Sequence, residues 1–455
     1  MKKIRFTTTQ IILLSFLMVI LLGSILLALP ISSADGDAVP YLDALFMATT
    51  STCVTGLVTL PTFSTWSVFG QIVILILIQV GGLGVITIMS GLMLLLKREM
   101  GIGDRLLIQD AFNLNTMSGL TGFIRNVMFG TFIIEGIGAV LYMIVFVPEF
   151  GAKGIWMSVF NSVSAFCNAG IDFIAENSLC NYATNPLINI VTSALIILGG
   201  LGYIVWWDVL HVIMTRTPNN RKVFRHLTLH SKIAIAVTAG LIIGGAILIF
   251  IFEYTNPLTN GELSLFDKIQ VSFFQSVTTR TAGFASVPQE NLTKASAAIS
   301  IILMLIGGSP VGTAGGMKTV TIAVLVCSAI ATIRNKNSAT MFGRRISEDS
   351  IKKAVAVAVA FFAICTTSTV LLLAAGDANV IDAVYETVSA TATVGLSRNF
   401  TAALNTVGKI IIIVTMYFGR VGPISLAVAL GSKSESQIVI SEPTEDISIG
   451  ERRKL

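Results

Sequence analysis

Charged residues are scarce in this chain of 455 residues. They make up 12% of the sequence, and hydrophobic residues make up 54%; soluble proteins usually carry about 25% charged residues. Several apolar runs reach the roughly 20 residues that a helix needs to cross a bilayer. The composition therefore excludes a string of soluble domains and indicates an all-α integral membrane protein.

Histidine and cysteine are also sparse, which limits the chemistry available. The three histidines, His211, His226 and His230, form no HExxH motif, and the five cysteines show no metal-ligand spacing and no disulfide framework. No Ser/His/Asp set is recognisable. An intramembrane enzyme is therefore the weakest alternative, and we expect no cofactor in this chain. The net charge of +5 gives no reason to expect nucleic-acid binding, because the basic residues follow the membrane topology.

One short stretch recurs four times along the chain. Its glycines, Gly56, Gly170, Gly283 and Gly395, lie 114, 113 and 112 residues apart. An aromatic residue stands ten positions before each glycine, and these residues are Phe46, Phe160, Phe273 and Tyr385. Self-similarity at a near-constant period indicates one structural unit that is repeated.

Each unit has the same order of apolar segments: a long one, a short one, the glycine loop and a second long one. A segment of 10–14 apolar residues is too short to span and is typical of a re-entrant piece. The sequence therefore predicts four helix–pore loop–helix repeats around a central pore, with eight spanning helices and four re-entrant half-helices. The predicted second helices cover residues 68–96, 187–213, 295–333 and 407–430. The predicted organisation is repeat 1 in residues 1–98, repeat 2 in 122–216, repeat 3 with a broken inner helix in 231–334, repeat 4 in 350–430, and a cytoplasmic tail in 431–455.

The basic residues orient these segments. Of the 30 lysines and arginines, 22 lie in the segments 1–8, 97–125, 216–232, 334–353 and 433–454. Six lie in the alternate segments, and Lys318 and Arg420 fall within predicted spans. Because basic loops stay in the cytoplasm, we expect a multi-pass protein of the plasma membrane, with both termini cytoplasmic and all four glycine loops facing outside.

Four glycine loops around one axis are suited to binding a monovalent cation. Glycine reaches backbone angles that other residues avoid, and a ring of backbone carbonyls can replace the hydration shell of K+. The half-helices also point their negative C-terminal ends at the centre. No ring of Asp or Glu accompanies the glycines, which argues against a divalent-cation filter. The candidate K+ selectivity-filter residues are Thr52, Cys53, Val54, Thr55, Gly56, Cys167, Asn168, Ala169, Gly170, Arg280, Thr281, Ala282, Gly283, Ala392, Thr393, Val394 and Gly395.

The second helix of the third unit contains five glycines and a proline within ten residues, a composition that cannot sustain an ordinary helix. The segment is Gly307, Gly308, Ser309, Pro310, Val311, Gly312, Thr313, Ala314, Gly315 and Gly316. Unwound backbone at membrane depth is tolerated where it lines an aqueous path. We therefore interpret the segment as a gating loop beneath the filter, with a simple helix kink as the alternative.

Arg420 lies in the last predicted span. A charged residue at this depth is costly and points to a function; the alternative is an arginine that reaches the cytoplasmic interface.

These features together resemble the Trk/Ktr/HKT superfamily of K+ transporters, over nearly the whole chain. The length is closest to the Ktr membrane subunits (KtrB), because Trk subunits carry extra helices before the first loop. In this superfamily, glycine at all four filter positions goes with K+ selectivity, and Na+-preferring members often have Ser at the first. The resemblance also implies an intramembrane gating loop at Gly307–Gly316, with Val311 where smaller residues are usual, and an arginine at Arg420 that works with it as a barrier to cations.

The same resemblance implies partners that no residue pattern reveals. Ktr membrane subunits are homodimers in the lipid bilayer and sit on a cytosolic ring of nucleotide-binding regulatory subunits. The transported ion would be K+, and Na+ activation is left open. A Na+-permeable or Na+-coupled transporter of the same superfamily remains an alternative. A symporter with inverted repeats is less compatible, because these four repeats share one orientation.

Overall fold

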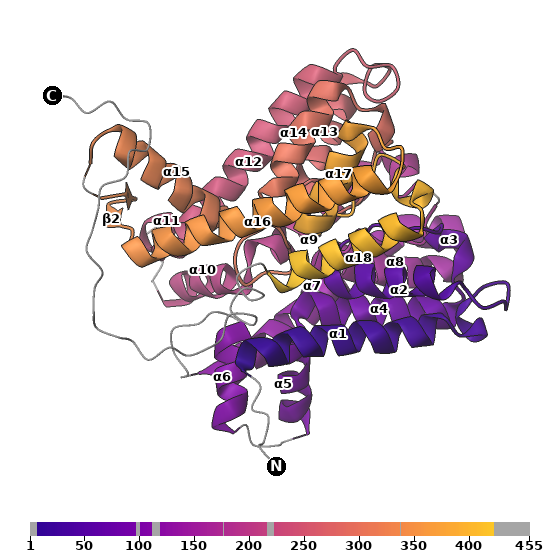
Figure 1. Cartoon of the computed structure of the whole chain (residues 1–455), viewed down its shortest axis with the longest axis horizontal. Coiled ribbons are helices and arrows are strands. Elements are labelled where there is room, and N and C mark those ends of the chain that lie inside the picture. The colour runs from indigo at the N-terminus through magenta and orange to yellow at the C-terminus, as the bar shows by residue number, and fades with distance from the viewer. Residues whose placement is uncertain are drawn as a thin grey trace.

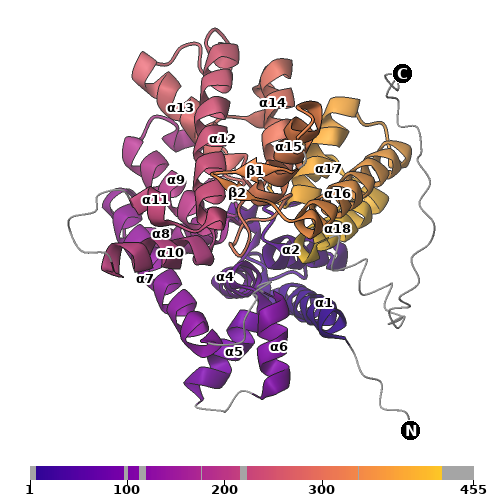
Figure 2. The ribbon, with the colours of Figure 1, turned by 90° about the vertical axis from the view of Figure 1, so that its left-hand side faces the viewer.

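The computed structural model describes residues 7–96, 101–111, 119–175, 177–215, 223–336 and 338–422. These residues are mostly helical, and one hairpin pairs strands β1 (Thr340–Met341) and β2 (Arg344–Arg345) in antiparallel register. Figure 1 shows the helices along the chain, and Figure 2 shows groups of helices around a common centre.

Twelve helices make up four similar groups, each containing a long first helix, a shorter half-helix and a second helix. The first helices are α1 (Thr8–Leu27), α7 (Leu120–Phe150), α12 (Leu229–Glu253) and α16 (Glu348–Ala375). The half-helices are α2 (Tyr41–Cys53), α8 (Ala152–Cys167), α13 (Leu265–Thr278) and α17 (Val380–Ala392). The second helices are α4 (Val68–Leu83), α9 (Pro186–Leu201), α14 (Lys294–Leu305) and α18 (Thr406–Val421).

Packing between the groups closes into a cycle. The second helix of each group contacts the half-helix of the next: α4 contacts α8, α9 contacts α13, and α14 contacts α17. The cycle closes because α18 contacts α2, which joins the last group to the first. Each half-helix therefore lies between its own first helix and the preceding second helix, and the four glycine loops meet near the centre.

The four first helices are each long and apolar enough to cross a membrane. Large apolar side chains remain exposed along them, such as Met18 (64%), Phe129 (68%) and Val359 (64%). In water such faces would be unfavourable, whereas in a bilayer they contact lipid tails. The exposed apolar surface therefore fits a multi-pass membrane protein.

The second helices of the first two groups are sharply bent within their predicted spans. The helix after α4 is α5 (Val85–Leu95), and the two are bent by 95° at Gly84. Likewise α9 and α10 (Tyr203–Thr215) are bent by 94° at Gly202. Both glycines have φ of +88°, a conformation that ends a helix and that other residues rarely adopt.

The later second helices also depart from simple spans. The third is interrupted over residues 306–318 and resumes as α15 (Thr319–Ile333), where glycine and proline predict a break. The fourth, α18, ends at Val421, and residues 423–430 of that predicted span lie outside the described residues, as does the tail 431–455. Full spanning of these two segments, and thus the eight-span layout, stays a prediction.

The remaining elements are short connections on either side of the helix groups. They are α3 (Thr62–Thr65), α6 (Ile102–Ala111), α11 (Val223–His226), and the 3₁₀ turns η1 (Pro30–Ser32), η2 (Cys180–Tyr182), η3 (Gln289–Asn291) and η4 (Thr401–Ala403).

Three of the four recurring aromatic residues lie in the core. Phe46, Phe160 and Tyr385 are at most 1% exposed. Phe273 is 39% exposed, and its neighbour Phe274 is fully buried instead. In the third group the buried aromatic residue is therefore Phe274, one position after the residue at the repeat spacing. The reason is that α13 ends five residues before its glycine, whereas the other half-helices end three residues before theirs.

Candidate functional site

Each glycine loop begins with a left-handed residue two positions before its glycine. These residues are Val54, Asn168, Thr281 and Thr393, with φ of 55°, 59°, 68° and 51°. The glycines Gly56, Gly170, Gly283 and Gly395 follow with φ of 100°, 62°, 81° and 95°. Left-handed backbone is a genuine outlier for the β-branched Val54, Thr281 and Thr393. Such strain persists only where the surroundings hold it in place, and it concentrates at functional sites.

The four loops form a closed ring of close backbone contacts. A Cβ on Gly56 would lie 2.5 Å from the carbonyl oxygen of Ala169, and one on Gly170 would lie 2.5 Å from that of Ala282. A Cβ on Gly283 would lie 2.6 Å from the carbonyl oxygen of Val394, and one on Gly395 would collide with that of Thr55. Each glycine thus faces a carbonyl of the next group, in chain order and back to the first.

A hydroxyl near the end of each half-helix holds its loop, a feature that we did not predict. Thr50 Oγ1 accepts from the Gly56 backbone N–H (2.9 Å), and Ser389 Oγ accepts from Gly395 (3.1 Å). Ser164 Oγ accepts from the N–H of Ile171 (3.1 Å) and donates to its carbonyl (2.6 Å). In the third group Thr278 Oγ1 donates to the carbonyl of Phe284 (2.6 Å). A hydroxyl six residues before three of the glycines is the sequence signal for this role.

Several predicted filter side chains have unpartnered polar atoms. Within the described residues, Thr52 Oγ1, Thr55 Oγ1, Thr281 Oγ1, Thr393 Oγ1 and both amide atoms of Asn168 are buried without a hydrogen-bond partner. All five residues are at most 1% exposed. Buried polar atoms without partners are costly, so their accumulation around one ring of carbonyls points to a site for water or a cation.

The position three before each glycine is less uniform. Cys53, Cys167 and Ala392 end their half-helices and are fully buried. Arg280 is 6% exposed, and its Nη2 donates to the Gly307 carbonyl at 3.1 Å. The Arg280 side chain therefore links the third loop to the start of the interruption at Gly307.

The segment 306–318 folds back on itself and attaches to the end of α9. The Gly307 N–H donates to the Met317 carbonyl (2.9 Å), and the Thr319 N–H donates to that of Gly308 (3.0 Å). Three further backbone bonds reach the bend at Gly202. They run from Ser309 N–H to the Gly200 carbonyl (2.8 Å), from Thr313 N–H to Gly199 (3.1 Å), and from Tyr203 N–H to Val311 (2.9 Å).

This attachment requires glycine at the bend, because a Cβ on Gly202 would collide with the carbonyl oxygen of Pro310. Val311 has φ of +61°, which is strained for a β-branched residue. Val311, which stands where smaller residues are usual in the Trk/Ktr/HKT superfamily, therefore lies at a strained point of the loop.

The same segment lies directly against two of the glycine loops. Thr313 Oγ1 donates to the Phe166 carbonyl at 3.0 Å, near the end of α8. A Cβ on Gly315 would lie 2.9 Å from the Ala392 carbonyl and would collide with Thr393 Oγ1. The segment therefore packs against the groups that carry the second and fourth glycine loops.

Arg420 connects this segment to the first group. Its Nη1 donates to the Thr313 carbonyl at 2.6 Å, and its Nη2 donates to the carbonyls of Gly81 and, at 3.4 Å, Gly82. Lys318 Nζ donates to the carbonyl of Ala314 at 2.6 Å. Over the described part of the chain, neither cation has a carboxylate within 4.0 Å. Both basic side chains therefore bond to backbone carbonyls on the side of the ring where the interrupted helix lies.

Two acidic groups near the ring carry no sequence motif. Glu135 on α7 is 5% exposed, and its carboxylate accepts from Gln79 Nε2 at 3.3 Å and lies 3.8 Å from Cys167 Sγ. In the sequence, the only hint of a role for Glu135 is that it is a lone acidic residue within an apolar run. Asp43 on α2 pairs with Lys409 on α18 (2.5 Å) and so ties the first group to the last.

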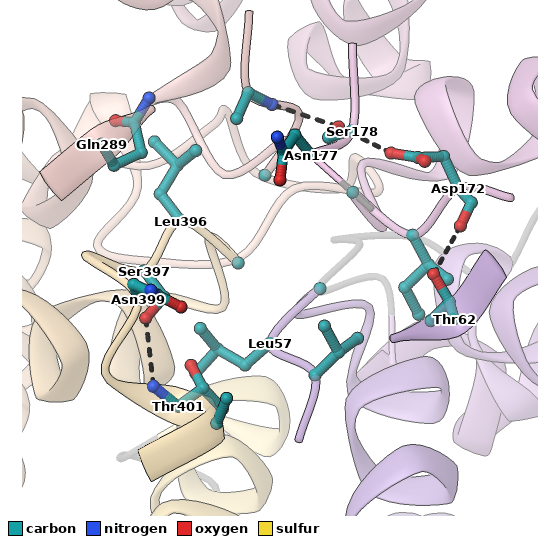
Figure 3. A pocket seen from close by; sticks show the side chains of 18 of the residues that line it. Leu57, Thr62, Asp172, Asn177, Ser178, Gln289, Leu396, Ser397, Asn399 and Thr401 are labelled. Atoms are coloured by element: carbon teal, nitrogen blue, oxygen red, sulfur yellow. Dashed lines mark hydrogen bonds between the residues drawn. The ribbon is translucent and has the colours of Figure 1, made fainter. Parts of the chain in front are cut away.

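A cavity of about 330 Å³ opens on the other side of the ring. Gly56, Gly170, Gly283 and Gly395 all line it, together with residues from the segments that follow them. Figure 3 shows Leu57 and Leu396 pointing into this space, with Asp172 and Ser178 on one side and Ser397 and Thr401 on the other. The carbonyl ring therefore lies between a cavity and the interrupted helix.

Comparison with known proteins decides the family. The model of the TrkH family, described as cation transport proteins, matches residues 3–440. The chain belongs to the TrkH family. It is 37% identical to the Ktr system potassium uptake protein B of Bacillus subtilis, over 96% of each chain. It is also 37% identical to the potassium/sodium uptake protein NtpJ of Enterococcus hirae, over 98% of each chain.

A solved structure supports the same fold. The potassium transporter TrkH of Vibrio parahaemolyticus superposes with a TM-score of 0.75 at 16% identity, covering 94% of this chain and 86% of that one. The resemblance to the Trk/Ktr superfamily is thereby confirmed. The chain is a membrane protein of a cation transporter family, not an enzyme.

Proposed function

We propose that this chain is the pore-forming subunit of a K+ uptake system and that K+ passes through the ring of glycine loops. The observation that carries the proposal is the closed ring itself, in which four glycines each face a carbonyl of the next group. Carbonyl dipoles and unpartnered hydroxyls offer neutral oxygen ligands, which suit a monovalent cation. The names of the relatives, potassium uptake protein and potassium/sodium uptake protein, agree with this cation class.

Close backbone contact explains why all four positions are glycine. Any larger residue would push a carbonyl of the neighbouring group away and would also have to adopt a left-handed conformation. Selectivity for K+ depends on the number and placement of these carbonyls. A Na+-permeable or Na+-coupled transporter remains the second candidate, because one relative is named for both ions.

The proposed gate is the segment Gly307–Gly316 together with Arg420. In this structure Arg420 bonds both the Thr313 carbonyl and the end of α4, so it fastens the segment beneath the ring. A positive charge at this place also repels an approaching cation. Opening would require the segment to leave its bonds to Gly199 and Gly200.

The assembly and orientation are part of the proposal. The resemblance to Ktr membrane subunits supports a homodimer in the plasma membrane that binds a cytosolic nucleotide-binding regulatory ring, with K+ as transported ion and Na+ as a candidate activator. The distribution of basic residues supports cytoplasmic termini. The cavity over the ring then faces outside, and the segment 307–316 faces the cytoplasm.

Ion uptake in a cell that lacks its own K+ transport tests the proposal. Initial uptake rates of K+, Rb+ and Na+ are measured in cells that express this chain together with the cytosolic regulatory subunits. Cells that express the regulatory subunits without this chain are the control. We expect uptake of K+ and Rb+ well above the control and much slower Na+ uptake. Equal rates for Na+ would favour the second candidate, and no uptake above the control would reject both.

A further inference from the structure

The four groups are not equivalent where their loops enter the outer cavity. Two positions after each glycine stand Val58, Asp172, Ala285 and Ser397, and all four line the cavity. Only the second group carries a carboxylate at this position. This charge lies two residues from a ring glycine, so its field reaches the point where a cation would enter the ring.

The Asp172 side chain is held in place although it is only 5% exposed. Its Oδ2 accepts from Ser178 Oγ at 2.6 Å, and its Oδ1 accepts from the Ile174 N–H at 3.4 Å. The backbone carbonyl of Asp172 accepts from Thr62 Oγ1 at 2.6 Å, which ties it to the first group. Figure 3 shows the contacts of Asp172 with Ser178 and Thr62 along one wall of the cavity.

No basic side chain neutralises this carboxylate. Within the described residues Asp172 has no Lys or Arg within 4.0 Å, whereas Arg398 pairs with Asp382 and Lys409 pairs with Asp43. The cations of the fourth group are therefore already compensated. A buried carboxylate without a counter-ion raises the local cation concentration in an adjoining water-filled space.

We propose that Asp172 makes the outer cavity a collecting site for a hydrated monovalent cation before it enters the ring. This inference rests on the proposed K+ uptake. A cavity of about 330 Å³ has room for about ten waters at the volume of liquid water, so a cation enters with part of its hydration shell. The site concentrates K+ and Na+ alike, because a single charge cannot distinguish them; discrimination is left to the carbonyl ring.

The protonation of Asp172 makes this site sensitive to external pH. Burial raises the pKa of Asp172 to about 6, although its hydrogen bonds to Ser178 and Ile174 oppose the shift. The carboxyl is therefore charged at pH 7.5, and its charge is lost as the pH falls through 6. Among the described residues, Tyr142 on α7 and Cys180 on η2 are titratable groups that interact electrostatically with Asp172, and Cys180 also interacts with Glu290 on η3. Tyr and Cys remain neutral in this pH range.

Two other carboxylates could contribute to a pH effect and need controls. Glu290 lines the cavity. Glu386 lies behind the opposite wall, where it accepts from Ser397 and Thr401. Asp172→Asn leaves Glu290 and Glu386 unchanged. Any pH dependence of the K+ affinity that remains in Asp172→Asn is therefore attributed to these two residues.

The test is the K+ concentration at half-maximal uptake, measured in the transport-deficient cell at external pH 7.5 and 5.5. At pH 7.5 we expect Asp172→Asn to raise this concentration about fivefold, the factor that corresponds to about 1 kcal/mol between unit charges near contact in water. We expect the maximal rate and the K+/Na+ preference to stay unchanged. For the wild type we expect a rise of about two- to threefold between pH 7.5 and 5.5, because a carboxyl with a pKa of about 6 is about three-quarters protonated at pH 5.5; for Asp172→Asn we expect little further rise.

Ser178→Ala is a control that keeps the carboxyl but removes the hydroxyl that donates to Asp172 Oδ2 and accepts from the Ala285 N–H. Because loss of the Asp172 bond raises the pKa of that carboxyl further, this variant and the wild type are compared at pH 8.5, where Asp172 stays charged. We expect its half-maximal K+ concentration to stay near the wild-type value. Adding Val58→Asp to Asp172→Asn returns a carboxylate to the same level of the cavity in the first group, and we expect it to restore part of the affinity.

Three results would overturn the inference: an unchanged K+ affinity in Asp172→Asn, an equal loss in Ser178→Ala, or a wild-type affinity that does not change with pH. A wild-type K+ affinity that does not change with pH would overturn the inference even if Asp172→Asn fails to reach the membrane. Loss of K+ uptake by the wild type would instead reject the proposed function, so the two failures are distinguishable.

Discussion

Replacing Arg420 with alanine tests the proposed gate. The substitution removes the donors to the Thr313, Gly81 and Gly82 carbonyls. A hydrogen bond from a charged group contributes about 1.5–3 kcal/mol, so loss of the Thr313 bond alone favours release of the segment by about tenfold or more, since about 1.4 kcal/mol is tenfold. The positive charge also disappears, and at 4 Å with an effective dielectric of 20 two unit charges interact by about 4 kcal/mol. Both effects act in the same direction.

We therefore expect Arg420→Ala to increase K+ uptake by at least about tenfold under conditions in which the gate limits the rate. Initial uptake in the transport-deficient cell measures this, normalised to the amount of protein at the cell surface. Arg420→Lys keeps the charge but cannot bond two elements through a planar fork, and we expect it to stay closer to the wild type. Equal rates for the alanine and lysine variants would refute the electrostatic barrier and leave Arg420 as a structural link only.

Four further predictions follow from the ring and its supports. Gly56→Ser should weaken K+ preference over Na+, because its Cβ would displace the Ala169 carbonyl; unchanged discrimination would remove Gly56 from the filter. Deletion within 312–316 should raise K+ uptake in well-expressed protein, and an unaltered rate would favour a simple kinked helix. Ser389→Ala should lower stability by about 1 kcal/mol and broaden selectivity, because Gly395 N–H loses its acceptor; a melting temperature and selectivity equal to wild type would contradict this. Lys409→Met should lower the melting temperature through the unpaired Asp43 carboxylate, and adding Asp43→Asn should recover part of the loss; no change in the single variant would show that the ion pair contributes nothing.

The repeat period led to the ring glycines but could not reveal how they meet. Gly56, Gly170, Gly283 and Gly395 were recognisable because each follows a half-helix at nearly constant spacing. Their contacts, however, join each glycine to a carbonyl of a different group. Such contacts depend on the packing of α4 on α8, and of the corresponding pairs around the cycle, which no local sequence pattern encodes.

The bends at Gly84 and Gly202 show where hydropathy is uninformative. Apolar residues continue on both sides of each bend, so the composition predicts one long span. The available signal was the Gly-Gly-Leu-Gly pattern that ends α4 and α9 alike. Gly81 and Gly199 do pack closely, against the carbonyls of Thr52 and Phe166. The last glycine of each pattern bends the chain instead, and at Gly202 the carbonyl of the distant Pro310 leaves no room for a side chain.

The third group departs from the repeat for a local reason. Its half-helix ends at Thr278, which moves the buried aromatic to Phe274 and leaves Arg280 bonded to Gly307. A difference of one or two residues at a helix end is beyond what periodicity resolves. The contacts of the supporting hydroxyls and of Glu135 also depend on how the helices pack, so the sequence alone did not reveal them.

The most direct test of the ion path is a structure determined in Rb+, with anomalous scattering used to locate the ion. Rb+ replaces K+ at carbonyl sites and identifies itself by its signal. The account predicts a peak on the axis of the ring, among the carbonyl oxygens of Thr55, Ala169, Ala282 and Val394. Well-resolved density that shows Rb+ elsewhere in the protein, with none inside the ring, would contradict the account.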